Sequence, residues 1–359
     1  MTIKISIDCM GGDHGTKVTV PASVSFLKSN ADAELVLVGR EDAIRAELNR
    51  LGVANHPRLT IKHAEDVVEM DDPVEVAMRR KRDSSMRVAI EMVREGQVQA
   101  SLSAGNTGAL MAISRYLLRT LPGVDRPAIC TILPNQKNGP TYMLDLGANV
   151  DCAPEHLRQF ARMASALVSS VEGRSRPTVG LLNVGTEEIK GNEVVKQASD
   201  LLREDHAKGV LNYHGNVEGN DIFEGTTDIV VCDGFVGNIA LKTAEGLGRF
   251  FRVVLTSEFK SGVFNMLGAL LAMKALRSIS QRMNPSRFNG ASLLGLRGLV
   301  FKSHGSADAF AYECAIKRAY DAVKHDVLQR ISITMAELLP SSESQIPSGE
   351  ATPFEQRTA

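Results

Sequence analysis

Short apolar runs rich in Val, Ile and Leu alternate along the chain with longer stretches of helical periodicity, such as 74–96, 154–171 and 189–205. Strands of a parallel sheet are continuous apolar runs when helices cover both faces. The pattern therefore predicts an α/β protein with a mostly parallel sheet between two helical layers. The expected strands are 3–8, 34–39, 58–63, 128–133, 141–146, 178–183, 228–233 and 298–303.

Residues 238–284 interrupt the alternation, because they carry no strand pattern. Two helical stretches joined near residues 260–264 predict a protruding helical hairpin. The longest apolar run, 263–273, is too short to span a bilayer, which needs about 20 residues, but contact with a membrane surface stays open. The hairpin tip is apolar at Val263, Phe264, Met266, Leu267, Leu270 and Leu271, and cationic on its flanks at Lys260, Lys274, Arg277 and Arg282.

We expect residues 1–338 to form one catalytic domain that includes the hairpin. The remaining segment, 339–359, is polar, contains Pro, Gly and Ser, and lacks periodicity. Such a composition cannot bury enough apolar surface to fold, so we expect a disordered tail.

Charge and cysteine content exclude several classes of protein. The net charge of −1 gives no basic field, so a nucleic-acid partner is not expected. The five cysteines are scattered without a C-x-x-C pair, which argues against a disulfide framework or a zinc site and favours a reducing cytosol. The first residues enter an apolar strand pattern with an acid at position 8, unlike a secretory signal. We expect a cytoplasmic protein.

Seven glycine-rich loops occur along the chain: 8–15, 145–151, 183–191, 233–238 and 303–308 follow expected strands, and 103–109 and 214–221 are the other two. Glycine lets backbone N–H groups approach a ligand, and a following helix N-terminus adds partial positive charge. Ligands of parallel sheets bind where strands lead into helices. These loops therefore predict an anion-binding rim. Its candidate phosphate- or substrate-binding residues are Gly11, Gly12, Asp13, Ser103, Asn106, Thr107, Asn149, Gly185, Thr186, Asn216 and Gly237.

Familiar cofactor and hydrolase motifs are missing. No expected strand is followed by G-x-G-x-x-G, and the chain contains no G-x-x-x-x-G-K-[ST], G-x-S-x-G or H-E-x-x-H. Asp8 and Asp13 lack a third carboxylate at metal-binding spacing. We therefore expect a small anion as ligand, with no cofactor and no metal.

Four residues are candidates for the chemistry. Lys190, beside a glycine loop, is a cation for phosphate or simply a solvated lysine. Asp233 and Asn238 lie five residues apart across a strand-to-helix turn, so both can face one pocket; helix capping competes as the role of Asn238. His304 is a general acid, an oxyanion donor or a structural histidine.

The segment 70–87 has Pro73 at a possible helix start and then a dense basic run. Such a run is usually a solvated face, but it also suits a site that gathers phosphate or an acidic carrier. Lys81, Ser84 and Ser85 are its candidates.

Ordered blocks along residues 3–328 resemble one family, the acyl-acyl carrier protein:phosphate acyltransferases. They include Asp8-Cys9-Met10-Gly11-Gly12-Asp13, Ser103-Ala104-Gly105-Asn106-Thr107-Gly108-Ala109, Gly180-Leu181-Leu182-Asn183-Val184-Gly185-Thr186-Glu187, Asp233-Gly234-Phe235-Val236-Gly237-Asn238 and His304-Gly305-Ser306. The family site corresponds to Lys190, Asp233 and Asn238. One departure is Asn289-Gly290, where the family commonly has Gly-Gly; we expect Asn289 to tolerate the left-handed backbone.

The resemblance implies a homodimer with a three-layer α/β/α fold like that of isocitrate and isopropylmalate dehydrogenases. It implies transfer of a long-chain acyl group from acyl carrier protein to inorganic phosphate, giving acyl phosphate for the glycerol-phosphate acyltransferase. It also implies that the tips of the hairpins pair in the dimer and touch the inner face of the cytoplasmic membrane. Cations near the hairpin, including Arg287, are plausible docking residues for the acidic carrier.

Rival functions remain. Acyl-CoA could replace the carrier-bound donor on the same fold, or the fold could serve a metal- and NAD-dependent hydroxyacid dehydrogenase. A non-catalytic scaffold on a lipid surface is a third alternative, and it would not need so many glycine loops.

Overall fold

The computed structural model describes residues 2–282 and 284–338, so the expected tail, 339–359, lies outside the described residues. Its strands are β1 (Ile3–Asp8), β2 (Ala33–Gly39), β3 (Leu59–His63), β4 (Ala100–Ser103), β5 (Ala128–Pro134), β6 (Pro140–Leu144), β7 (Thr178–Leu182), β8 (Asn212–Val217), β9 (Ile229–Val231), β10 (Ala291–Leu294) and β11 (Leu299–Lys302). Its helices are α1 (Thr16–Ser29), α2 (Glu41–Arg50), α3 (Val74–Arg79), α4 (Ser85–Arg94), α5 (Thr107–Leu118), α6 (Pro154–Glu172), α7 (Glu193–Ala207), α8 (Asp221–Glu224), α9 (Gly234–Lys260), α10 (Val263–Leu271), α11 (Met273–Arg282), the 3₁₀ helix η1 (Pro285–Phe288), α12 (Ala309–Lys324) and α13 (Val327–Ala336).

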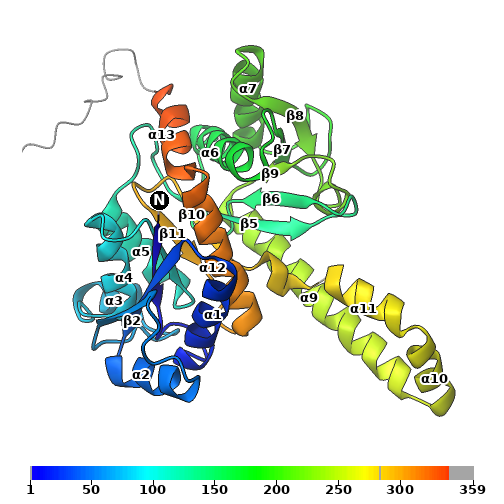
Figure 1. Ribbon diagram of the computed structural model, residues 1–359. Helices are drawn as coiled ribbons and strands as arrows, with labels where there is room; N and C mark the ends of the chain where they lie inside the picture. Colours follow the sequence, from blue (N-terminus) through cyan, green and yellow to red (C-terminus); the bar gives the residue numbers. More distant parts are fainter. Residues whose placement is uncertain (1, 283, 339–359) are drawn as a thin grey trace, which may run out of the picture.

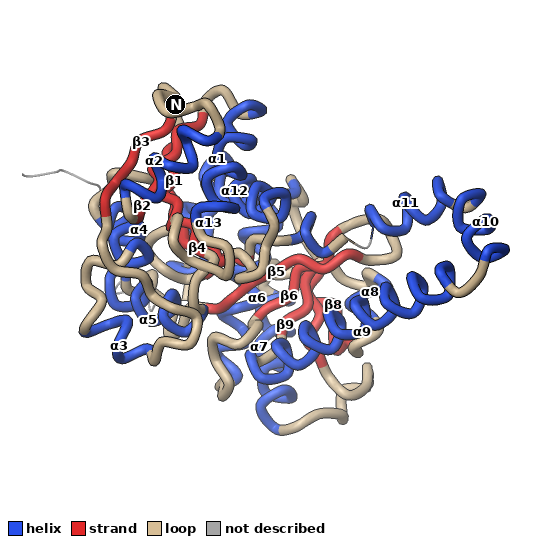
Figure 2. The backbone as a smooth tube through the Cα atoms, turned by 90° about the horizontal axis from the view of Figure 1, so that it is seen from below, coloured by secondary structure: helices blue, strands red, loops and turns tan. Residues whose placement is uncertain are grey.

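The strands form one sheet in the order β3-β2-β1-β4-β11-β10-β5-β6-β9-β7-β8. Pairing is antiparallel at β11–β10, β10–β5 and β5–β6, and parallel elsewhere. Three successive reversals mean that the parallel strands of one half run opposite to those of the other. Figures 1 and 2 show the two halves as two lobes, with β1–β4 in the first and β6–β9 in the second.

Helices cover both faces of the sheet. On β2, Leu35 and Leu37 join the apolar core formed with α1 and α12, whereas Val36 and Val38 enter a separate core with α4. Successive strand residues point to opposite faces, so this alternation records two covering layers. The predicted three-layer α/β fold is confirmed.

Three strands were missed by the sequence pattern: β4, β8 and β10. The strands β4 (ASLS) and β10 (ASLL) have four residues each, of which three and two are small or polar, and β8 (NYHGNV) is an edge strand with Gly215 inside. β4 and β8 pair only with strands distant in sequence, and β10 pairs with the distant β5 as well as with β11, which follows it closely; this pairing overrides weak local preference.

The predicted hairpin is confirmed as an arm of α9, α10 and α11 that projects away from both lobes (Figure 1). None of the described side chains of α10 is buried, and Phe264 is 90% exposed. Within the described residues, no helix combines the length and apolar character needed to cross a membrane. The arm therefore presents a large apolar surface that the rest of this chain leaves uncovered.

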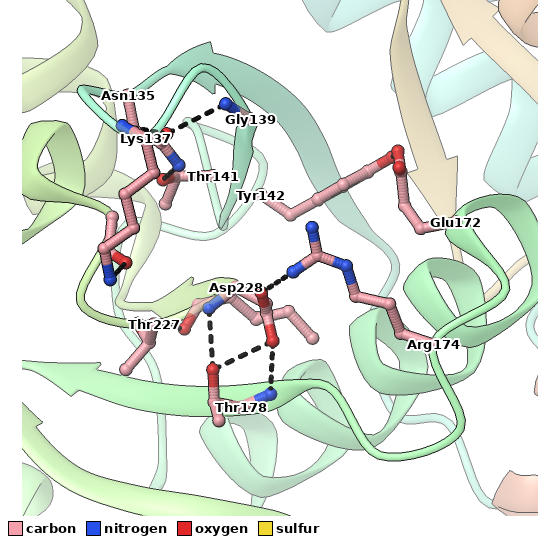
Figure 3. Close-up of polar contacts among 12 residues, drawn as sticks. Asn135, Lys137, Gly139, Thr141, Tyr142, Glu172, Arg174, Thr178, Thr227 and Asp228 are labelled. Atoms are coloured by element: carbon pink, nitrogen blue, oxygen red, sulfur yellow. Dashed lines mark hydrogen bonds and ion pairs between the residues drawn. The ribbon is translucent and has the colours of Figure 1, made fainter.

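Polar contacts fix the ends of β7 and β9 that lie away from their glycine loops (Figure 3). The Asp228 carboxylate accepts hydrogen bonds from the backbone N–H and hydroxyl of Thr178, at 2.8 and 2.9 Å, and pairs with Arg174. Nearby, the Tyr142 hydroxyl donates to Glu172 at 2.6 Å. These contacts join α6 and the segment after it to β6, β7 and β9. They hold in place the ends of these strands that lie opposite the glycine loops.

A second ionic contact ties α6 to α7. Asp205 of α7 is fully buried, and its carboxylate accepts hydrogen bonds from Arg158 and Arg162 of α6, with Arg162 Nε 2.7 Å from Oδ2. Removing one partner of a buried ion pair leaves the other charge uncompensated.

Asp205→Asn is expected to lower the free energy of unfolding by about 3 kcal/mol or more, because two guanidinium groups lose their carboxylate partner. Asp200→Asn is the matched control on α7, since its pair with Arg203 is exposed; its effect should stay below about 1 kcal/mol. Denaturant unfolding curves measure both. Equal effects of the two changes would contradict this assignment.

Candidate active site

Asp8 organises the first glycine loop. It ends β1, is 1% exposed, and accepts hydrogen bonds from the hydroxyls of Ser85 and Ser103, each at 2.6 Å. The backbone N–H groups of Met10 and Gly11 also donate to it, each at 3.2 Å. Burial raises the pKa of this carboxyl above its usual value, while the hydrogen bonds act in the opposite direction. Asp8 therefore fixes the start of the loop against α4 and β4.

The main chains of the loops after β1, β4 and β11 pack closely against one another. A Cβ on Gly11 would lie 2.7 Å from the nitrogen of Gly105. Gly12 has a φ of +84°, and its Cβ would lie 2.8 Å from the carbonyl oxygen of Gly305. The Asp13 N–H donates to that same oxygen at 2.9 Å. Only glycine permits this approach, so the predicted loops do meet in the first lobe.

Asp145 plays the same part in the second lobe. It follows β6, is fully buried, and accepts hydrogen bonds from the backbone N–H groups of Ile129, Leu146 and Ala148, at 2.8, 2.7 and 3.3 Å. Asn149 donates to it from both its backbone and its side chain, at 2.6 and 3.0 Å. Burial raises the pKa of Asp145, against these hydrogen bonds. The loop after β6 is thus built around one carboxylate.

The start of α9 packs directly on this loop. A Cβ on Gly237 would lie 1.9 Å from the carbonyl oxygen of Asp145, so no other residue fits. Asp233 caps α9 by accepting the N–H three residues on, at 2.8 Å. Asn238 lies beside Gly147, where an added Cβ would be 3.6 Å from the Asn238 side chain. The capping role considered for Asn238 therefore belongs to Asp233.

Helix α9 starts in the second lobe and comes near the end of β11. With 3.6 residues per turn, Asn238, Lys242 and Glu245 share one helix face. The charges of Lys242 and Glu245 act on the pKa of His304, and Lys242 also acts on that of Lys302. The face that begins at Asn238 is therefore turned toward the end of β11. Asn238 thus lies on the helix face whose next turns come near His304.

The geometry of His304 makes it a hydrogen-bond donor. Its Nδ1 lies 2.9 Å from the Ser306 hydroxyl and 3.3 Å from the Ser306 backbone N–H, which donates to it. Because Nδ1 accepts, the neutral ring carries its proton on Nε2. Burial lowers the pKa of His304 below its usual value, so the ring is neutral at pH 7.

Asn289 holds the turn that carries His304. Its side-chain oxygen accepts the His304 N–H at 2.9 Å, and its amide donates to the Ser303 hydroxyl and the Ala311 carbonyl, each at 2.8 Å. Its backbone is extended, with φ −64° and ψ 147°, whereas Gly290 has φ +105°. The expectation of a left-handed Asn289 was wrong; the residue acts through its amide group.

Lys302 was missed as a site residue. Its Nζ donates to the carbonyl oxygens of Ala104, at 3.2 Å, and of Ser303. Burial lowers its pKa to about 8, against the charges of Asp8 and Asp13. The sequence signal for Lys302 was its position as the single cation near the end of the expected apolar strand 298–303. Asp145, an acid ending the expected strand 141–146, carried the same kind of signal.

The loop after β7 carries Lys190. The Asn183 amide donates to the Lys190 carbonyl oxygen at 3.1 Å, and buried Gly185 packs against the Lys190 side chain. The Lys190 ammonium is exposed and forms no ion pair within the described part of the chain. Thr186 is exposed on the same loop, and Asn216 holds the loop by donating to the Glu187 carbonyl oxygen at 3.1 Å.

Other predicted site residues have contacts of their own. Lys81 pairs with Asp72 at 2.5 Å. Asn106 caps α5, and its amide donates to the Met70 carbonyl oxygen at 2.8 Å, with exposed Thr107 next to it. Among residues 2–282 and 284–338, no hydrogen bond or ion pair joins Lys81 or Lys190 to the side chains of Asp233, Asn238 or His304. Their catalytic and binding roles stay predictions.

Comparisons with solved structures agree on the fold. A phosphotransacetylase from Streptococcus pyogenes superposes with a TM-score of 0.60 and 19% identity, over 90% of this chain and 94% of that one. The EutD phosphotransacetylase from Staphylococcus aureus gives 0.56 and 15%, over 94% of each chain. A 4-hydroxythreonine-4-phosphate dehydrogenase from Klebsiella pneumoniae gives 0.50 and 18%, over 90% and 98%. This agrees with the expected dehydrogenase-like architecture.

Sequence comparisons reach further. A family model described as "Fatty acid synthesis protein" matches residues 3–330. The phosphate acyltransferase of Janthinobacterium sp. (strain Marseille) is 71% identical over 342 residues, 95% of each chain. That of Herminiimonas arsenicoxydans is 67% identical over 357 residues, 99% of this chain and 100% of that one. The chain belongs to the phosphate acyltransferases, a family of acyltransferase enzymes.

Proposed function

We propose that this chain transfers a long-chain fatty acyl group from acyl carrier protein to inorganic phosphate, forming acyl phosphate for phospholipid synthesis. Membership of the phosphate acyltransferase family supports acyl transfer to phosphate. One structural observation supports the site: the glycine loop built around Asp145 packs on the start of α9, whose next turns come near His304 and Lys302, and the Asp8 charge acts on Lys302. Backbone N–H groups and a helix N-terminus suit an anion.

The reaction needs no cofactor. An oxygen of phosphate attacks the thioester carbonyl carbon, a C–O bond forms, and the carbonyl becomes a tetrahedral oxyanion. The oxyanion collapses, the C–S bond breaks, and the thiolate leaves with the proton released by the phosphate hydroxyl. Because a thioester is already activated, positioning phosphate in line with the carbonyl is the main task of the protein.

Each candidate residue has a part in this scheme. Lys190 neutralises phosphate, and Asp233 orients it through the carboxylate oxygen that the cap of α9 does not use. Asn238, which forms no side-chain hydrogen bond in the described residues, donates to the oxyanion. His304 donates to it from Nε2. A preorganised donor of this kind is worth roughly 3–4 kcal/mol.

The acyl donor decides between this proposal and its rival, acyl-CoA. Palmitoyl-carrier protein and palmitoyl-CoA, each mixed with enzyme and labelled phosphate, should both be assayed for labelled acyl phosphate. The proposal expects product from the carrier at a higher kcat/KM. Product from palmitoyl-CoA alone would show that acyl-CoA is the donor instead. No product from either donor would refute the proposal. A nicotinamide absorbance change with a hydroxyacid would instead favour a dehydrogenase.

The arm is the proposed contact with membrane and with a second subunit. Exposed apolar residues continue from the tip, at Leu267 and Leu270, along α9 to Phe250 and Val253. Lys260 and Lys274 flank the tip, as expected for shallow insertion among anionic headgroups. We place the enzyme in the cytoplasm, peripherally on the inner face of the membrane, where its product reaches the glycerol-phosphate acyltransferase.

Lys190→Ala should raise the KM for phosphate by about 10- to 100-fold, because a charge-assisted contact is lost. The KM for the thioester should change little. Steady-state kinetics with phosphate varied measures the effect, and Lys317→Ala, which removes an exposed lysine of α12, is the control. An unchanged phosphate KM would rule this role out.

We also give Lys302 a part in attracting phosphate, because its ammonium lies against the glycine loop at Ala104; phosphate binding should then depend on pH. Its pKa of about 8 means that the ammonium is charged at pH 7 and lost as the pH rises. The phosphate KM should therefore increase about tenfold between roughly pH 7 and pH 9.5. In Lys302→Met it should already be high at pH 7 and stay nearly constant. A parallel pH profile in the variant would contradict this role.

Leu267→Asp with Leu270→Asp should weaken binding to vesicles of anionic phospholipid by about tenfold or more, since charged groups would have to enter the apolar layer. Sedimentation with vesicles measures binding. The control, Ser257→Asp, places one charge on α9 before the tip. If the double variant bound vesicles as well as the wild type does, the proposed insertion of the tip would be refuted.

A further inference from the structure

A pocket of about 400 Å³ lies beside β8, the edge strand of the second lobe. It is bounded by β8, by the C-terminal part of α7 and by the loop after β7. Its volume is within the range of small-molecule sites. Polar side chains dominate its lining, including Thr186, Glu188, Arg203, His206, His214 and Asn216.

Asn216 lines this pocket and has a buried acceptor without a partner within the described residues. It is 8% exposed, and its amide nitrogen donates to the Glu187 carbonyl oxygen at 3.1 Å. That bond fixes the orientation of the amide. Its Oδ1 is buried without a hydrogen-bond partner within the described residues. A buried acceptor without a partner is unfavourable, so a small shift that exposes this oxygen to an N–H or O–H group of a ligand would be favourable.

The pocket mouth carries donors for an anion. Tyr213 of β8 pairs with Val179 and Gly215 pairs with Gly180, so the strand bulges at His214, which is exposed. Bulges often re-aim side chains beside functional sites. His206 Nδ1 accepts the Tyr213 N–H at 3.1 Å, which leaves the Nε2 proton of the neutral ring for another partner.

Arg203 adds a cation to this mouth. Its guanidinium contacts Glu188 and Asp200, each at 2.9 Å, and its side chain is 40% exposed. A guanidinium has five N–H donors, so these two carboxylates leave others available to a phosphate group.

The pocket adjoins the loop of the proposed phosphate cation. Thr186 and Glu188 belong to the loop that ends with Lys190, and Asn216 holds its middle. The strands β9, β7 and β8 are consecutive in the sheet and parallel, so their following loops lie along one edge. A long, narrow ligand in the pocket thus has a path along this edge toward Asp233.

We propose that this pocket binds the 4′-phosphopantetheine arm on which the acyl carrier presents its thioester; the inference rests on the proposed function. The arm is long and narrow, with a phosphodiester at one end, two amides in the middle and the thioester at the other end. An amide N–H donates to Asn216 Oδ1, and the phosphodiester lies against Arg203 and His206. The thioester end extends along the loop toward Lys190.

Two thioester donors separate the arm from the acyl chain: palmitoyl-carrier protein and palmitoyl-N-acetylcysteamine, which lacks the phosphodiester and one amide. Arg203→Gln should raise the KM for the carrier-bound donor about tenfold and leave that for the short donor within about twofold. Lys208→Gln, which removes a charge at the end of the same helix from a residue that does not line the pocket, should change neither. If Arg203→Gln raised the KM for both donors equally, or changed neither, the proposal would be overturned.

Free 4′-phosphopantetheine tests the arm without the protein surface of the carrier and without turnover. Calorimetric titration should show binding to the wild type and about tenfold weaker binding to Arg203→Gln. No binding to the wild type, or equal binding to both, would also overturn the proposal. An enzyme that binds this compound but makes no acyl phosphate would refute the proposed reaction and leave the pocket assignment standing.

Discussion

Two buried carboxylates determine the geometry on which the candidate site depends. Asp8 and Asp145 stand directly at or after the ends of β1 and β6, and each gathers the backbone N–H groups of the glycine loop that follows. A buried carboxylate is costly unless it is well hydrogen-bonded, so each loop has one favourable conformation. The remaining N–H groups of the loops are thereby held in place for a ligand.

Helix α9 joins this geometry to the surface of the molecule. Its first turn packs so closely on Asp145 that Gly237 cannot carry a side chain, its next turns approach His304 and Lys302, and its far half leaves the body as the arm (Figure 2). A single rigid element therefore runs from the proposed reaction centre to the proposed membrane contact. A long acyl chain is poorly soluble in water, and this arrangement would give it a short route between the reaction centre and the membrane.

The sequence predicted the fold class, the arm and the glycine loops, because buried apolar runs and helical periodicity are local signals. It did not predict β4 or β8, whose pairing partners lie far away in the chain, or β10, which pairs with the distant β5 as well as with its close neighbour β11. Asp8, Asp145 and Lys302 were not ranked as site residues, since only three-dimensional packing shows that they are buried and which loops they hold. Asn289 was misjudged for the same reason: its role lies in side-chain hydrogen bonds across three segments.

A crystal structure of the enzyme with inorganic phosphate and a non-reactive thioether analogue of the acyl carrier tests the central claim most directly. The account predicts phosphate within about 3 Å of backbone N–H groups of the glycine loops and of the Lys190 ammonium, beside the analogue's sulfur. Phosphate bound elsewhere, with these loops empty, would contradict it.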